Sequence, residues 1–254
     1  MRIGIVGKGG VGKTTVAALI AQAYAGRGRR VVAIDTDSNP NLGLSLGLDL
    51  AAVDALPALP RSVVVGDGRG EHDAASLLVE YGADTPGGPT LVTGLRIEEA
   101  GAGCACGGHA TVKSLLAEAL ESDADVTVVD MEAGLEHLSR SGGTLAAVDV
   151  LVAVVEPSRK SVVTAARTQR LAAELGIAAT VVLGNKVRDE ADAEFLADAC
   201  AAHGLDLAGV LPHEEIVRDA DRAGRHLDGR EAPRLRAALD DVIDRLDGLV
   251  AAPA

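Results

Sequence analysis

The feature that most constrains the fold is a glycine-rich loop near the start of the chain. Its sequence is Gly7-Lys8-Gly9-Gly10-Val11-Gly12-Lys13-Thr14. The loop follows a run at residues 2–6 that predicts a short buried strand and precedes a helix-forming stretch from Thr15, which is the strand, turn and helix context of a phosphate-binding loop. The sequence therefore predicts a nucleoside triphosphate site.

Each residue type in this loop has a physical task. Glycines let backbone N–H groups wrap a phosphate, and the following helix presents its positive end to the anion. We expect Lys13 to neutralise the β- and γ-phosphates and the Thr14 hydroxyl to coordinate Mg²⁺. Lys8 is a second lysine in the loop, with a solvated surface position as the alternative. The loop residues assigned to the nucleotide are Gly9, Gly10, Val11, Gly12, Lys13, Thr14 and Thr15.

Composition and strand pattern favour one α/β domain over residues 1–254. The chain is 48% apolar but only 1% aromatic, so its core must be built from Ala, Val, Leu and Ile. Runs rich in β-branched residues alternate with helical patterns, which predicts a mostly parallel sheet flanked by helices on both faces. Ligands would bind at the carboxyl ends of its strands. The expected strands lie at 2–6, 31–35, 126–130, 150–155, 180–184 and 205–210.

Three further segments have distinct patterns. Residues 48–70 and 82–108 are rich in Gly and Pro and are expected to be loops around short strands. Residues 233–249 carry apolar side chains at helical spacing between acidic ones, which predicts a surface helix capping the fold.

Charge bears on the partners. The formal net charge of −13 disfavours attraction to nucleic acid and to anionic lipid, and the scarcity of aromatic residues argues against base stacking. The sequence has no signal-peptide pattern and no apolar run as long as a membrane span. We therefore expect a cytoplasmic protein without nucleic-acid or membrane partners.

Carboxylates follow two of the expected strands. Asp35 and Asp37 leave the strand at 31–35, and we expect Asp37 to orient the attacking water close to Mg²⁺; a turn-forming or helix-capping acid is the alternative. Asp130 ends an apolar run in the Walker B pattern and is expected to hold Mg²⁺, a solvated strand-end Asp being the alternative. Gly134 could offer a backbone N–H to the γ-phosphate in a second switch segment.

Polar residues also end two later strands. Asn185, followed by Lys186, could hydrogen-bond a purine through its amide, although a simple turn would use the same residues. Leu211, Pro212 and His213 fall on the same expected rim, where backbone groups could complete the base pocket. The His213 side chain itself is expected at the surface.

Two of the three cysteines form a pair. Cys104 and Cys106 flank one residue in a glycine-rich loop, whereas Cys200 has the spacing of a core position on a helix. One pair supplies two sulfur ligands, too few for a closed zinc site or an iron–sulfur cluster. A second copy across a two-fold axis would supply the other two. Two incidental thiols are the alternative.

With these residues the chain resembles the deviant Walker A ATPases, P-loop NTPases of the SIMIBI type that include the MinD/ParA septum-site and partition ATPases and the nitrogenase iron protein. Within that group it looks most like the carbon monoxide dehydrogenase accessory ATPases that support nickel insertion. The segments that carry the resemblance are Gly7–Thr15, Asp35–Leu42, Cys104–Cys106, Asp130–His137, Val155–Arg159 and Gly184–Lys186.

The resemblance implies ATP and ADP as ligands with Mg²⁺, and a homodimer that holds nucleotide between its subunits. Lys8 would reach the phosphates bound by the partner, and Cys104 and Cys106 would bind Ni²⁺ or Zn²⁺ between subunits. The client would be a metalloenzyme such as carbon monoxide dehydrogenase. Two other functions compete with this one: a positioning ATPase for plasmids or membranes, and an electron-transfer reductase with a cluster that bridges the subunits.

Overall fold

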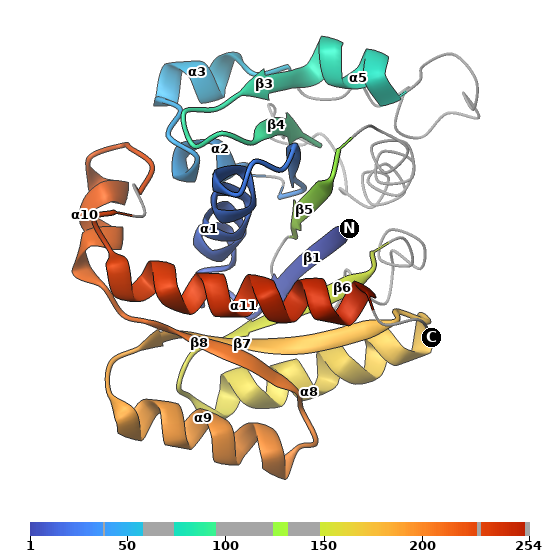
Figure 1. Ribbon diagram of the computed structural model, residues 1–254, viewed down its shortest axis with the longest axis vertical. Helices are drawn as coiled ribbons and strands as arrows, with labels where there is room; N and C mark the ends of the chain where they lie inside the picture. The colour runs from blue at the N-terminus through green and yellow to red at the C-terminus, as the bar shows by residue number, and fades with distance from the viewer. Residues whose placement is uncertain (38, 58–73, 95–123, 132–147, 228–229, 252–254) are drawn as a thin grey trace, which may run out of the picture.

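The computed structural model describes residues 1–37, 39–57, 74–94, 124–131, 148–227 and 230–251 (Figure 1). The strands are β1 (Arg2–Gly7), β2 (Val31–Asp35), β3 (Gly82–Asp84), β4 (Thr90–Thr93), β5 (Val126–Asp130), β6 (Val150–Val155), β7 (Ala179–Val187) and β8 (Leu207–Pro212). The helices are α1 (Lys13–Gly26), α2 (Leu42–Ser45), α3 (Leu50–Ala55), α5 (Ala74–Tyr81), α8 (Arg159–Glu174), α9 (Glu190–Ala202), α10 (Glu215–Arg222) and α11 (Pro233–Ala251).

Within the described ranges, the strands form one eight-stranded sheet in the order β3-β4-β2-β5-β1-β6-β7-β8. Neighbouring strands are parallel except for β3 and β4, which pair antiparallel at one edge. The predicted α/β class is therefore confirmed. Each strand predicted from β-branched runs is present, and the one expected at 205–210 begins and ends two residues later, at β8.

Helices cover both faces of the sheet (Figure 1). Side chains alternate along β1, so that Ile3 and Ile5 pack with the apolar residues of α1 and α11, whereas Val6 packs with those of α8 and α9. Residues of α9 such as Leu196 and Cys200 are buried in this second layer, as predicted for Cys200. Within the described ranges, no helix has the length and apolarity to cross a membrane.

The two segments expected to be loops contain more regular structure than the sequence suggested. Residues 50–55 form helix α3, with the Asp49 carboxylate accepting a hydrogen bond from the Ala52 N–H at 2.7 Å. In the second segment, β3 and β4 are the expected short strands, joined by a turn in which the Thr85 hydroxyl donates to the Pro89 carbonyl oxygen at 2.7 Å.

The predicted C-terminal surface helix is confirmed as α11, with its apolar face packed into the core and its other face exposed. The five side chains that the spacing picked out are all at most 3% exposed; they are Leu235, Leu239, Val242, Ile243 and Leu246. Polar contacts also join α11 to the C-terminal end of α1: the Tyr24 hydroxyl donates to Asp247 at 3.0 Å, and Arg27 pairs with Asp240 and Asp244. Burial, reinforced by the Asp247 charge, raises the pKa of Tyr24 above its ordinary range.

Replacing Tyr24 tests this brace between α1 and α11. Tyr24→Phe removes a buried hydroxyl and its hydrogen bond, so we expect the free energy of unfolding in urea to fall by about 1 kcal/mol. Tyr24→Ala should cost about 3–5 kcal/mol because it also opens a cavity. The second tyrosine, Tyr81, is the matched control, since its hydroxyl donates to the neighbouring Glu80 at an exposed site. Equal effects of Tyr24→Phe and Tyr81→Phe would contradict the brace.

Candidate functional site

The carboxyl ends of the parallel strands form one edge of the sheet. This edge carries the glycine-rich loop, both predicted acidic strand ends and the predicted base-binding residues. β1 lies between β5 and β6, so the loop that leaves β1 passes between the ends of these two strands. Because the strands are parallel, Asp35 of β2 and Asp130 of β5 end at the same edge, and their Cα atoms are register partners. This is the edge at which open α/β sheets bind ligands.

Close packing and backbone conformation explain the glycines of the loop. A Cβ atom on Gly7 would lie 2.5 Å from the carbonyl oxygen of Val154 on β6, so no side chain fits there. Gly10 and Gly12 have φ angles of 84° and 92°, in the left-handed region that favours glycine. Gly12 is the N-cap residue of α1, which starts at Lys13, and as a glycine it has no side chain to bond the N–H groups of the first turn. The N–H groups of the first turn of this helix therefore face the loop.

The two lysines of the loop have different environments. Lys13 is 9% exposed, at the first turn of α1, and its charge acts on Asp130. Lys8, like Gly9 and Gly10, is exposed at the tip of the loop. The buried lysine suits a ligand held within the loop, and the exposed one suits a ligand or partner that approaches from outside.

Asp130 is a buried carboxylate with an incomplete set of partners. It is 2% exposed and hydrogen-bonds the Thr14 side chain, while its Oδ1 atom has no hydrogen-bond partner among the described residues. Burial raises its pKa to about 7; the Asp35 charge adds to this effect, and the Thr14 hydrogen bond and the Lys13 charge oppose it. A buried acceptor without a partner is the position that a cation or a bound ligand would satisfy.

Asp35 has a positioning role that the sequence analysis did not assign. It is 1% exposed and accepts backbone N–H groups from Asp37 at 3.0 Å, Asn41 at 2.9 Å and Leu42 at 2.8 Å. These three bonds hold the turn that leads into α2. Burial raises the pKa of Asp35 to about 6, against the lowering effect of the three bonds. The signal in the sequence was its place as the last residue of an apolar strand run.

Asp37, the predicted catalytic carboxylate, lies two residues beyond Asp35, after the end of β2. It is half-buried, and its Oδ1 accepts the Asn39 N–H at 2.9 Å. Between the two aspartates, the Thr36 hydroxyl donates to the Asp130 carbonyl oxygen at 2.9 Å, a contact with no signal in the sequence. The end of β2 is thus tied both to α2 and to the end of β5.

The end of β7 contacts the phosphate loop directly. The Asn185 amide donates to the Val11 carbonyl oxygen at 2.8 Å, and the Lys186 ammonium donates to the Gly10 carbonyl oxygen at 2.6 Å. The predicted contact of Asn185 with a base would use the amide oxygen and the second amide N–H of this side chain.

The residues at the end of β8 that were predicted to complete the base pocket are only partly accessible to a ligand. The Leu211 side chain is completely buried, and the His213 N–H already donates to the Val187 carbonyl oxygen at 2.7 Å. Pro212 has no N–H, so carbonyl groups are what this rim offers to a ligand. The His213 side chain is exposed, as expected, and its ring lies 3.2 Å from Glu215.

Other predicted site residues lie outside the described part of the chain. They are Cys104, Cys106 and Gly134. Over the described ranges, three or more His, Cys, Asp or Glu side chains nowhere gather into a metal-binding group. The aspartates at the sheet edge suit Mg²⁺, which takes one or two carboxylates and completes its shell with water and substrate phosphate.

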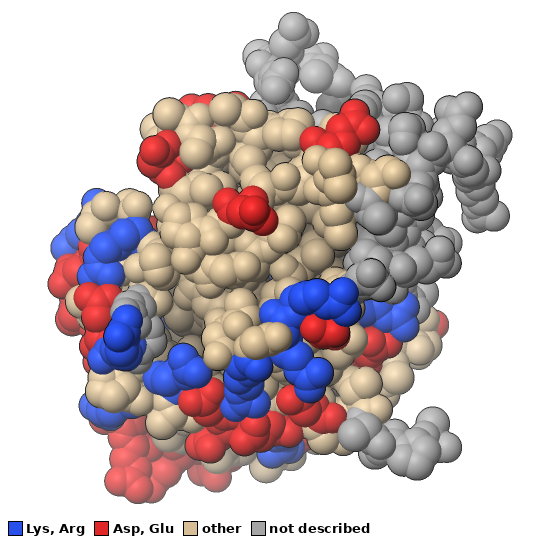
Figure 2. All heavy atoms as spheres, turned by 45° about the horizontal axis from the view of Figure 1, so that its top comes forward, with Lys and Arg blue, Asp and Glu red and all other residues tan. Residues whose placement is uncertain are grey.

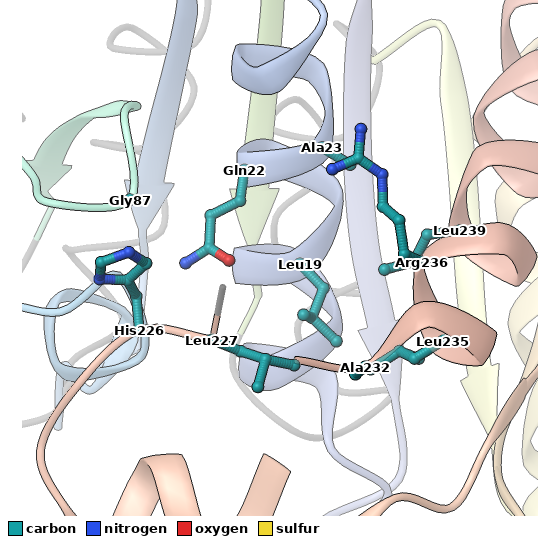
Figure 3. A pocket seen from close by; sticks show the side chains of 10 residues that line it. All are labelled: Leu19, Gln22, Ala23, Gly87, His226, Leu227, Ala232, Leu235, Arg236 and Leu239. Atoms are coloured by element: carbon teal, nitrogen blue, oxygen red, sulfur yellow. The ribbon is translucent and has the colours of Figure 1, made fainter. Parts of the chain in front are cut away.

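A separate hollow of about 270 Å³ lies along α1, away from the phosphate loop (Figure 3). Its floor is apolar, and the Gln22 amide points across it toward His226. None of the catalytic, nucleotide-binding or metal-binding residues predicted from sequence lines it. The lining residues are Leu19, Gln22, Ala23, Gly87, His226, Leu227, Ala232, Leu235, Arg236 and Leu239.

The molecular surface carries mixed charge on the face that Figure 2 shows, where basic and acidic side chains lie side by side. Ion pairs of such side chains in the structure include Arg225 with Glu231 at 2.7 Å and Arg236 with Asp240 at 3.0 Å. Pairing of this kind reduces the positive potential that the arginines present to an anionic partner.

Known proteins are similar to this chain in sequence and in fold. A family described as the CobQ/CobB/MinD/ParA nucleotide binding domain matches residues 4–227. The carbon monoxide dehydrogenase accessory protein CooC of Rhodospirillum rubrum is 37% identical over 238 residues, which cover 88% of each chain. An uncharacterized ATP-binding protein of Methanocaldococcus jannaschii is 32% identical over 96% of this chain and 98% of its own.

Among solved structures, the septum site-determining protein MinD of Pyrococcus horikoshii, complexed with Mg-ADP, superposes with a TM-score of 0.73. It is 21% identical, and the match covers 99% of both chains, so the likeness shows a shared fold. The family match extends over most of the chain and includes the loop between β1 and α1. The chain therefore belongs to the CobQ/CobB/MinD/ParA nucleotide-binding domain family.

Proposed function

We propose that this protein is a cytoplasmic ATPase that works as a maturation factor for a nickel enzyme of the carbon monoxide dehydrogenase kind. The observation that carries the ATPase part is the sheet edge itself, where Lys13 and Thr14 of the phosphate loop meet the partly unsatisfied carboxylate of Asp130. The accessory role rests on the similarity to CooC over 88% of both chains. Residues 1–254 would act as one nucleotide-binding domain.

The loop would bind the phosphates of ATP through its backbone N–H groups. Lys13 would neutralise the β- and γ-phosphates from within the fold, where its low exposure strengthens the attraction. The predicted base contacts would come from the rim formed by Asn185 and the carbonyl groups near Pro212. The neighbouring helix end adds the positive potential of its first-turn N–H groups.

The residues beside the loop fit a magnesium ion. The Thr14 hydroxyl and the free Oδ1 atom of Asp130 are oxygen donors of the kind that Mg²⁺ prefers. Bound Mg²⁺ would draw negative charge from the phosphates and favour phosphoryl transfer. Gly134 would add a backbone N–H near the γ-phosphate.

Asp37 is our candidate for orienting the attacking water. Asp35 supports this role, because its bond to the Asp37 N–H fixes the backbone that carries the Asp37 side chain. Positioning of this kind is the main contribution that proteins make to phosphoryl transfer.

Lys8 supports a nucleotide-linked homodimer. Its exposed place at the loop tip leaves its ammonium accessible to the phosphates of a second subunit. A contact that exists only in the ATP-bound dimer would let ATP stabilise that dimer, since a ligand shifts an equilibrium only by binding one state better. Cys104 and Cys106 of two subunits would then complete four thiolate ligands for Ni²⁺ or Zn²⁺.

A positioning ATPase is the second candidate, because the family that matches this chain also contains MinD and ParA. That function requires a basic DNA-binding surface or a basic amphipathic segment. The acidic net charge and the ion-paired arginines favour the maturation factor.

Asp130→Asn tests the magnesium site. Since burial raises the pKa of Asp130, the folded protein loses stability relative to the unfolded chain as pH rises from the ordinary 3.8 toward about 7. At pH 8 the nucleotide-free variant should therefore melt about 2–4 °C higher, the shift that 1 kcal/mol produces in a protein of this size. The additional stabilisation that Mg²⁺ gives to the ADP complex should disappear. Asp84→Asn, at an exposed strand end, should change neither quantity; a full Mg²⁺ effect in Asp130→Asn would remove Asp130 from the site.

Lys8→Ala and Lys13→Ala separate the two proposed lysine roles. Lys13→Ala should weaken ATP binding about 100-fold, because a buried charge-assisted contact is lost. Lys8→Ala should bind ATP as a monomer but weaken the ATP-dependent dimer at least about tenfold, as measured by sedimentation or light scattering. Lys160→Ala, at an exposed site on α8, is the control. A Lys8→Ala protein that dimerises like the wild type would refute the contact between subunits.

Replacing both Cys104 and Cys106 by Ala tests the metal site. We expect the variant to lose bound Ni²⁺ or Zn²⁺ and the metal-dependent part of dimerisation while still binding ATP, measured as metal content and mass with ADP and ATP. Cys200→Ala should retain the metal because Cys200 is buried in the core. Unchanged metal content in the double variant would overturn this part of the proposal. Charge-transfer bands in anaerobically purified protein would instead favour the iron–sulfur reductase.

A further inference from the structure

The end of β7 departs from regular strand geometry where it approaches the phosphate loop. Gly184 pairs with Val210 and Val187 pairs with Pro212, so β7 contains one more residue than β8 between these pairs. An extra residue of this kind is a β-bulge, which turns side chains in new directions. In a regular strand Asn185 and Lys186 would point to opposite faces, whereas here both reach the loop.

The backbone of Lys186 is strained. Its φ angle is 59°, and among the described residues it is the one non-glycine residue with a positive φ. Left-handed backbone costs a residue other than glycine about 1 kcal/mol or more. That a lysine occupies this position despite the strain indicates that the hydrogen bond of its side chain to the loop offsets the cost.

The two contacts act on consecutive peptide groups of the loop. Lys186 holds the Gly10 carbonyl and Asn185 holds the Val11 carbonyl, both toward the end of β7. In a trans peptide the N–H group points away from the preceding carbonyl. The N–H groups of Val11 and Gly12 are therefore turned to the opposite side, and the contact of the Val11 N–H with the Lys8 carbonyl oxygen is long, at 3.4 Å.

We infer that Asn185 and Lys186 form a clamp that presets the phosphate loop, with Lys186 as a positioning residue for the phosphates rather than a contact to the base. The inference rests on the proposed ATP site. By holding two carbonyls outward, the clamp aims backbone N–H groups at the anion before it binds, which lowers the cost of ordering the loop. The exposed Lys186 ammonium also adds positive charge beside the loop.

Packing against the clamp, as well as its own φ angle, requires a glycine at position 12. A Cβ atom at Gly12 would lie 2.6 Å from the Asn185 amide nitrogen, so a side chain there would push Asn185 off the Val11 carbonyl. Gly10, by contrast, has open space around its Cβ position. The clamp thus accounts for one loop glycine through packing and not only through φ.

Lys186→Met and Lys186→Gly test the clamp in the full-length protein. Both remove the ammonium and should weaken binding of ATP and of inorganic triphosphate by about tenfold each. Lys186→Gly should in addition melt at or above the wild-type temperature, because glycine adopts the positive φ without strain. Lys186→Arg should restore part of the affinity, and Lys160→Met is the matched control on α8.

Hydrogen exchange provides a readout that does not need a ligand. In the nucleotide-free protein, a peptide covering residues 7–13 should exchange faster in Lys186→Met and Lys186→Gly than in wild type or Lys160→Met. Wild-type exchange in both variants would overturn the clamp. So would unchanged triphosphate affinity, or a loss confined to ATP with inorganic triphosphate unaffected, which would place Lys186 at the nucleoside.

The same experiment separates this inference from the proposed function. Wild-type protein that binds neither ATP nor inorganic triphosphate would refute the ATPase, while faster loop exchange in the variants would still support the clamp. Wild-type protein that binds ATP, with variants identical to it in both assays, would refute the clamp alone.

Discussion

The pairing of β1 with β5 on one side and β6 on the other is the constraint on which the site depends. It places the loop after Gly7 directly beside the end of β5, and it leaves no room for a side chain at Gly7 against the Val154 carbonyl. Since α1 then crosses to β2, two strands away, the acidic ends of β2 and β5 lie together at the same edge. The chemistry of the site follows from that order of strands.

This arrangement buries two carboxylates close to one another, which by itself disfavours the charged forms of both. Asp35 offsets the cost with three backbone N–H groups and serves as a structural anchor. Asp130 has fewer partners among the described residues, and its Oδ1 atom has none there. Two neighbouring acids of one type thus differ in how far the surrounding described residues satisfy them, which is the basis for proposing only Asp130 as a ligand for Mg²⁺.

Much of this protein was predictable from local patterns. The phosphate loop was recognisable because its glycine spacing has few other uses, and β5 and β6 because an unbroken β-branched run favours a strand buried on both faces. The apolar face of α11 followed from its spacing. Helix α3 was missed because its apolar and alanine-rich residues are bounded by the Gly- and Pro-rich segment around them, and its cap, Asp49, was the one local signal.

The sequence by itself determined the α/β class, the nucleotide-binding loop and the strands that carry the acids, because these depend on spacing along one short segment at a time. Only the tertiary structure decided that Asp35 anchors the turn after β2, since this depends on which backbone N–H groups fold back onto the end of that strand. It also brought Asn185 and Lys186 onto a loop 174 and 176 residues away. Contacts over such separations arise from strand order and from a bulge, and neither is encoded in the local pattern of residues.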